Sequence, residues 1–220
     1  MASWMVHLRI ADALLDRIKG LCPVEFVVGN IAPDSGVPNE DWSVFTPSTH
    51  VSHFKRVGSK DAKDIDINAY LEKYWTAELR QSYCRQQESF YLGYLTHLLT
   101  DVLWSQKIAR PSVARYPEEA ERDRTALIWK LKQDWYDLDH KFLRDHPGFR
   151  AFEIYRSAVG FRNTYMDIFS EDALDNRREY ITGFYDQHPE GLDREYPYLT
   201  EAAMNRFVEE AVEQILLQIT

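Results

Sequence analysis

An all-α fold is the structural class that the sequence predicts, with residues 1–220 forming a single helical domain. Apolar side chains recur with the periodicity of an amphipathic helix through most of the chain. The 220 residues, 45% of them hydrophobic, are enough for a core that needs no disulfide staples. No internal repeat, low-complexity tract or linker divides the sequence.

The first helix is expected from Ser3, a favourable N-cap, to Ile18, and Gly20 and Pro23 end it. From residue 21 to about residue 64 the helical pattern breaks down, so this segment is expected to be irregular. An irregular segment of such length in a compact domain is usually functional. Its pattern is interrupted at Pro23, Pro33, Gly36, Pro38 and Pro47.

Helices are expected again in the rest of the chain. Asp66 and Thr200 are good N-caps, Pro111 is expected to close one long helix, and Pro117 fits the first turn of the next. The segment 191–198 is expected to be a loop. The predicted helices cover residues 67–79, 82 to 104 or 108, 117–144, 149–159, 172–186 and 201–220.

Charge and cysteine content narrow the function classes. The net charge of -9 argues against binding to a nucleic-acid backbone or to an anionic membrane. Cys22 and Cys84, the two cysteines, are far apart and do not form a disulfide framework, which suits a reducing compartment. With no signal peptide and no long apolar stretch in the sequence, we expect a cytoplasmic protein.

The strongest local motif is the run from Phe90 to Asp101, FYLGYLTHLLTD. On a helix, His97 and Asp101 are four residues apart and share a face, which Gly93 is expected to leave open. Burying an imidazole and a carboxylate among apolar neighbours is costly unless each has a strong partner. A divalent metal would satisfy both, since each is an ordinary Zn²⁺ ligand. From this pair alone, a plain hydrogen bond between them is the simpler interpretation.

Two more candidate ligands come earlier in the chain. His7 lies on the apolar first helix, where a lone histidine is more often a satisfied core residue. Asp34 follows Pro33 in a segment where Gly29 and Gly36 permit sharp turns, so its carboxylate can be presented at a set angle. An Asx-turn explains Asp34 equally well by itself.

The other histidine candidates lie near residues 50 and 140. His53 is preferred over His50 as a ligand, because its neighbours Val51 and Phe54 suggest that it enters the core. Asp137 and His140, three residues apart, could share a helix face and add weaker ligands. A solvated acidic face is the simpler interpretation of that pair.

Taken together, these residues resemble the zinc-dependent phospholipase C family, whose fold and chemistry the single-strand-specific zinc nucleases share. The resemblance is carried by His7, by Ala32-Pro33-Asp34, by His53 or His50, and by Gly93-Tyr94-Leu95-Thr96-His97 with Asp101. It covers the first half of the chain. It implies an all-helical hydrolase in which Asp34, His53, His97 and Asp101 hold one metal ion and His7 contributes to a neighbouring one.

The resemblance also implies an activity. The expected enzyme hydrolyses a small-molecule phosphate ester, a phosphodiester or a phosphomonoester, with metal-activated water. Zn²⁺ is the expected ion, one to three per chain, although Ni²⁺ or Mn²⁺ also suits such ligands. Asp34 is the candidate proton acceptor, and Tyr94, Trp104 and Trp42 are candidate pocket walls. The alternative function is a metal-stabilised helical protein that binds a ligand without turnover.

Overall fold

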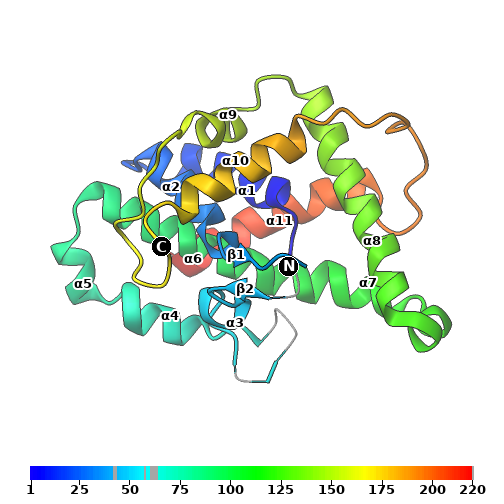
Figure 1. Cartoon of the computed structure of the whole chain (residues 1–220), viewed down its shortest axis with the longest axis horizontal. Coiled ribbons are helices and arrows are strands. Elements are labelled where there is room, and N and C mark those ends of the chain that lie inside the picture. Colours follow the sequence, from blue (N-terminus) through cyan, green and yellow to red (C-terminus); the bar gives the residue numbers. More distant parts are fainter. Residues whose placement is uncertain (42–43, 57, 60–63, 220) are drawn as a thin grey trace.

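Helices make up most of the computed structural model, which describes residues 1–41, 44–56, 58–59 and 64–219 (Figure 1). This confirms the all-α prediction. The described elements are α1 Trp4–Arg17, α2 Pro23–Ile31, η1 Ala32–Asp34, β1 Val37–Pro38, β2 Phe45–Thr46, α3 Thr49–Ser52, α4 Ile67–Tyr74, α5 Ala77–Ser82, α6 Arg85–Trp104, the π-helical turn η3 Ser105–Ala109, α7 Arg110–Ala114, α8 Pro117–Asp145, α9 Arg150–Ser157, α10 Ala173–Tyr185 and α11 Glu201–Ile219.

The segment predicted to be irregular, from residue 21 to about residue 64, contains a helix, α2, so the prediction is wrong for Pro23–Ile31. Pro23 occupies the first turn of α2, where its missing N–H costs nothing, so it begins this helix rather than merely ending the previous one. Gly29 lies inside α2 and makes no turn. The short antiparallel pair β1–β2 follows, with Val37 opposite Thr46.

Helices α2 and α6 run parallel and in backbone contact. The Cys22 N–H donates to Ser89 Oγ, and two turns later the Asn30 carbonyl meets His97 Nδ1, both at a sequence separation of 67. Glycine makes this approach possible. A Cβ added to Gly93 would lie 2.1 Å from the Phe26 carbonyl oxygen. Gly93 therefore admits a helix backbone, instead of leaving an open face beside His97.

Several predicted helix boundaries shift. The helix expected over 67–79 ends at Tyr74, and α5 begins after a break, at Ala77. Pro111 does not close the long helix, because it lies in the first turn of α7, which continues from α6 through the π-helical turn. Asp66 and Thr200 cap α4 and α11 as predicted, accepting the N–H groups of Ala69 and Ala203.

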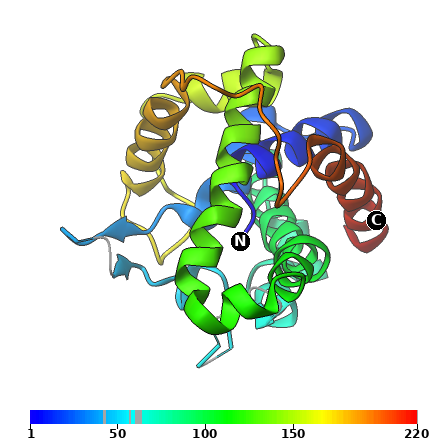
Figure 2. The same ribbon diagram turned by 90° about the vertical axis from the view of Figure 1, so that its right-hand side faces the viewer.

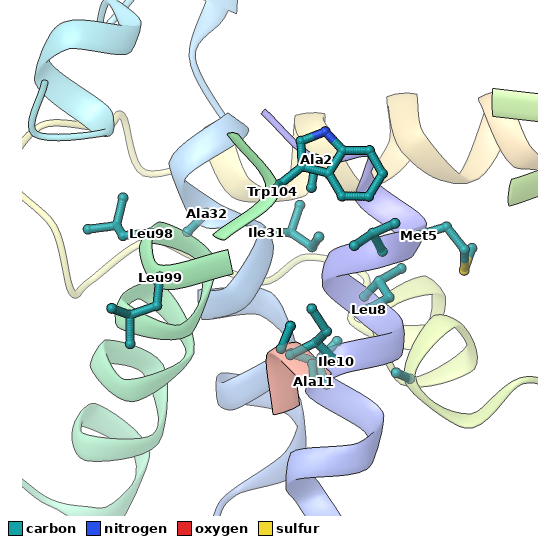
Figure 3. Close-up of a cluster of buried hydrophobic side chains, with 14 of the residues drawn as sticks. Ala2, Met5, Leu8, Ile10, Ala11, Ile31, Ala32, Leu98, Leu99 and Trp104 are labelled. Atoms are coloured by element: carbon teal, nitrogen blue, oxygen red, sulfur yellow. The ribbon is translucent and has the colours of Figure 1, made fainter. Parts of the chain in front are cut away.

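The part of the hydrophobic core between α1, α2 and α6 includes Met5, Leu8, Ile31 and Leu98 (Figure 3), and the same core extends to residues of α8 to α11. Trp104, at the end of α6, is fully buried and packs edge-to-face against Trp135 and Phe207.

The second half of the chain surrounds this centre. Figure 2 shows α8 facing the viewer, with α10 to its left and α1 and α11 to its right. The loop after residue 190 packs on α8, where buried Asp134 accepts the N–H of Tyr198. No helix in the described part of the chain is long and apolar enough to cross a membrane.

Candidate metal centre

Helix α6 places His97 and Asp101 on one face, and both side chains are fully buried. The distance from His97 Nε2 to Asp101 Oδ2 is 3.9 Å, which is too long for a hydrogen bond. Asp101 Oδ2 has no hydrogen-bond partner among the described residues. The simple pairing of these two side chains is therefore excluded, and a buried carboxylate oxygen is left without the partner that burial requires.

Helix α1 brings His7 to the same point. Its ring stacks on that of His97 with the centroids 3.7 Å apart, and His7 Nε2 lies 3.5 Å from Asp101 Oδ1. Neither ring nitrogen of this fully buried side chain has a hydrogen-bond partner within the described ranges. A satisfied core histidine would have one, so the interpretation of His7 as an ordinary core residue does not hold.

The segment from η1 to α3 supplies the other side of the cluster. His53, just after α3, is fully buried, and its Nε2 lies 3.3 Å from Asp34 Oδ1 and 3.7 Å from Asp101 Oδ2. His53 Nε2 and His97 Nε2 are 3.3 Å apart. The 3₁₀ turn η1 ends at Asp34, whose side chain is 10% exposed. All five residues predicted as ligands thus converge.

Backbone and hydroxyl groups fix the orientation of two of the imidazoles. His97 Nδ1 donates to the Asn30 carbonyl at 2.7 Å, which leaves Nε2 as the nitrogen that faces the cluster. His53 Nδ1 lies 3.0 Å from Ser52 Oγ, so its Nε2 also faces inward. The N–H of Ala2 donates to Asp101 Oδ1 at 2.7 Å. Such partners commonly hold metal-binding histidines and carboxylates in place.

The electrostatics favour two carboxylate anions beside a neutral His97 imidazole. Burial lowers the pKa of His97 to about 3, and the nearby His7 adds to this effect. For Asp101, burial alone would raise the pKa, but the N-terminal ammonium, the His7 contact and His97 hold it well below the ordinary value. Burial likewise opposes ionisation of Asp34, and the contact with His53 outweighs it, so its pKa is lowered.

Two overlapping groups of donor atoms fit a cation. One comprises His7, His97 and Asp101, the other Asp34, His53 and His97, with the donor atoms of each group within 4.8 Å of one another. Nitrogen and carboxylate donors of this kind are ordinary ligands of Zn²⁺. The unpartnered atoms of His7 and Asp101 are the second observation that fits a metal, because an ion would satisfy both.

No family model, no curated protein and no solved structure is significantly similar to this chain.

The other candidate ligands lie outside the cluster. His50 is exposed on α3, as expected from the preference for His53. Asp137 is paired with Arg194 at 2.7 Å, and His140 packs on the rings of Phe184 and Tyr185. The helix face around them is not a solvated one, because His140 and the neighbouring Asp134 and Asp139 are buried.

The predicted pocket walls have other positions. Tyr94 is fully buried, stacks on Tyr70 and donates its hydroxyl to the Ser52 carbonyl, so it supports the turn that carries His53. Trp104 belongs to the core (Figure 3). Trp42 lies outside the described residues.

Two backbone groups that contact the cluster, the Asn30 carbonyl and the Ala2 N–H, were not predicted from the sequence. Asn30 acts through its backbone carbonyl, which no side-chain pattern reveals. Ser3 stands at the N-cap of α1, but its hydroxyl donates to Asp139 at 2.9 Å instead of capping the helix. Ala2, just before it, acts through its backbone N–H, which no side-chain pattern reveals either.

Proposed function

We propose that the protein is a metal-dependent hydrolase that acts on a phosphate ester. The observation that carries this proposal is the convergence of three buried histidines and two carboxylates, with polar atoms of His7 and Asp101 left unpartnered. The resemblance of these same residues to the zinc-dependent phospholipase C family supports the choice of reaction.

His7, His53, His97 and Asp101 are the proposed ligands. Zn²⁺ is the preferred ion, although Ni²⁺ and Mn²⁺ suit the same donors. Because His97 Nδ1 is engaged by Asn30, its Nε2 is the nitrogen left for a metal, and it can serve one ion at a time. The two donor groups therefore compete for His97. A bound divalent ion would polarise a water molecule and neutralise charge on the phosphoryl oxygens.

Asp34 is the proposed proton acceptor. It is the least buried of the five residues, so it marks the side from which water and substrate reach the cluster. Its lowered pKa keeps the carboxylate anionic at neutral pH, and the contact with His53 Nε2 fixes one of its oxygens. Asp34 can thus hold and orient an attacking water and take its proton, a role that typically contributes a factor of ~10²–10⁴ in rate.

A chromogenic ester assay tests the proposal. The purified protein is stripped with a chelator, reloaded separately with Zn²⁺, Mn²⁺ and Ni²⁺, and incubated with bis(4-nitrophenyl) phosphate and 4-nitrophenyl phosphate. We expect turnover that reloading restores and chelation abolishes. In Asp34→Asn, turnover should fall at least ~100-fold. Metal content is measured on every sample.

The matched control is Asp137→Asn, a carboxylate paired with Arg194 on α8 and not part of the cluster. It should keep both metal and turnover. Stoichiometric metal in the wild type with no hydrolysis of either ester under any loading would reject the proposed activity. That result would favour the alternative, a metal-stabilised binding protein.

A further inference from the structure

Arg177 and Lys132 stand out among the cations of this acidic chain. Many of the other arginines and lysines in the described ranges pair with a carboxylate, as Arg150 does with Asp12 and Asp16. Within the ranges that the structure describes, neither Arg177 nor Lys132 forms an ion pair. Arg177 nevertheless contacts the segment that follows Asp34, and Lys132 is influenced by the charge of Asp34.

Arg177, on α10, is 7% exposed. Its Nη2 donates to the carbonyl of Gly36, two residues after Asp34, at 2.5 Å, and its guanidinium lies over the Tyr180 ring. A guanidinium carries five N–H donors, so one carbonyl leaves most of them available. Burying this charge without an anion is costly, which indicates that an anionic ligand completes the site.

Tyr155, on α9, has a buried hydroxyl on which the charges of Arg177 and Asp34 both act. Burial raises the pKa of its hydroxyl, the positive charge of Arg177 lowers it, and the carboxylate of Asp34 raises it again. The ring therefore lies in the field of both charges. The hydroxyl is buried and has no hydrogen-bond partner among the residues described, so it is a second unsatisfied donor in this region.

Lys132, on α8, is the second cation without an ion pair in the described ranges, and its side chain is half-buried. Burial lowers the pKa of its ammonium group, and Asp34 is the charge that opposes this effect. Its Nζ lies 5.1 Å from the centroid of the Trp129 ring. The side chain is thus half-buried, with no backbone or carboxylate hydrogen-bond partner in the described parts of the chain.

We infer that Arg177 and Lys132, with the hydroxyl of Tyr155, bind the anionic group of the substrate beside Asp34 and His53. A guanidinium fork matches two oxygens of a phosphoryl group, and an ammonium adds a point charge. The identity of the anion as phosphoryl rests on the proposed function; the anion site itself rests on these three side chains. Substrate class is thus set by cations of α8 and α10, outside the metal ligands.

Direct binding of inorganic phosphate tests this site without any turnover. Calorimetric titration of the Zn²⁺-loaded protein should show saturable binding, and Arg177→Gln and Lys132→Gln should each weaken it about 10- to 100-fold, as expected for losing a hydrogen bond to a charged group. Lys130→Gln is the control on α8, because Lys130 is exposed and already paired with Glu119. Its phosphate affinity should match that of the wild type.

The variants separate an anion site from a structural role. If Arg177→Gln loses metal or folded structure, its bond to Gly36 has a structural role, and Lys132→Gln then decides, since Lys132 holds no backbone group in the described structure. Unchanged phosphate affinity in folded, metal-loaded Lys132→Gln and Arg177→Gln overturns the inference, as does a wild type that binds no phosphate. Ester turnover with unchanged KM in both variants would leave the hydrolase standing and remove only the anion site.

Discussion

The backbone carbonyl of Asn30 accepts a hydrogen bond from His97 Nδ1 at 2.7 Å, and this contact joins the C-terminal end of α2 to the centre of α6. It exists because the two helices touch along their backbones, with Gly29 and Gly93 at the contact. The same contact determines which nitrogen of His97 faces Asp34, His53 and Asp101. Helix packing and ligand orientation therefore depend on one another.

Replacing Gly93 by alanine should damage both stability and metal binding. The added Cβ would lie 2.1 Å from the carbonyl oxygen of Phe26, which belongs to a helix backbone and cannot rotate away. We expect a loss of about 1–3 kcal/mol in the free energy of unfolding, measured with denaturant. Displacing Asn30 from His97 should also weaken Zn²⁺ binding by about 10- to 100-fold.

Gly183→Ala is the control for that variant. Gly183 is also in a helix, α10, but a Cβ there meets nothing within 4 Å. Since alanine favours a helix over glycine, this change should be neutral or stabilising by up to about 1 kcal/mol. Equal stability of Gly93→Ala and Gly183→Ala would show that the interhelical contact is not as tight as described.

Replacing Asp101 by asparagine should remove the metal and spare the fold around Ala2. The amide oxygen can still accept the Ala2 N–H, while the negative charge that faces His7, His53 and His97 is lost. Zn²⁺ affinity is measured by competition with a chromogenic chelator. Losing a group that only hydrogen-bonds a metal ligand typically lowers metal affinity by roughly 10- to 100-fold, and we expect a larger loss for Asp101→Asn because it removes a ligand. If Asp101→Asn kept its full Zn²⁺ content at the same free Zn²⁺ concentration as the wild type, Asp101 would not be a ligand. Asp137→Asn is the control and should bind Zn²⁺ as the wild type does.

Metal binding should stabilise the fold, because the ligands come from distant parts of the chain and assemble only when it is folded. At a free Zn²⁺ concentration 100 times Kd, the gain is about 2.7 kcal/mol. For a chain of this length, that corresponds to a rise in Tm of roughly 5–10 °C. The rise should vanish with excess chelator and be absent in Asp101→Asn. If Zn²⁺ did not change the Tm of the wild type, the proposed metal centre would be contradicted.

Asp139 should make stability depend on pH near neutrality. Burial raises its pKa to about 7, although Ser3 and Tyr185 donate hydrogen bonds to it and Arg9 lies nearby. Because the folded pKa exceeds the unfolded one, the stabilising contribution is complete below about pH 4 and is lost as the pH rises through about 7. The total is at most about 4 kcal/mol.

Asp139→Asn tests that dependence by denaturant unfolding at pH 5 and pH 8. The wild type should lose stability relative to the variant between these two values. His140, whose pKa is lowered by burial, has the opposite dependence, but it is present in both proteins and cancels in the comparison. If the free energy of unfolding changed equally in the two proteins between pH 5 and pH 8, Asp139 would not titrate in this range.

The helical class could be read from the sequence because periodicity and caps are local properties. Asp66 and Thr200 form the expected caps, and α8 begins at Pro117 as predicted. Helix α2 was missed because Pro23 and Gly29 were interpreted as turn signals. Their actual roles, a first-turn proline and a glycine against the Phe90 carbonyl, depend on a neighbour that lies far away in the sequence.

Part of the candidate site could also be predicted from the sequence, because the spacing of two residues on one helix is a local property. His97 and Asp101 share a helix face, and the resemblance added His7, Asp34 and His53, all of which the structure brings together. Pocket residues could not be inferred from local pattern alone. Tyr94 and Trp104 are aromatic and near His97 in sequence, but they point into the interior. Arg177 comes from an element distant in sequence, and its contact with Gly36, two residues after Asp34, is visible only in the fold.

The candidate metal ligands all lie within the first 101 residues, whereas the side chains inferred to meet the substrate lie between residues 132 and 177. If both proposals hold, ion coordination and ligand choice are encoded in separate stretches of the chain. Substitutions in α8, α9 and α10 could redirect the protein toward a different anion and leave the ion in place. Changes in α2 or α6, where two backbones touch, would disturb both at once.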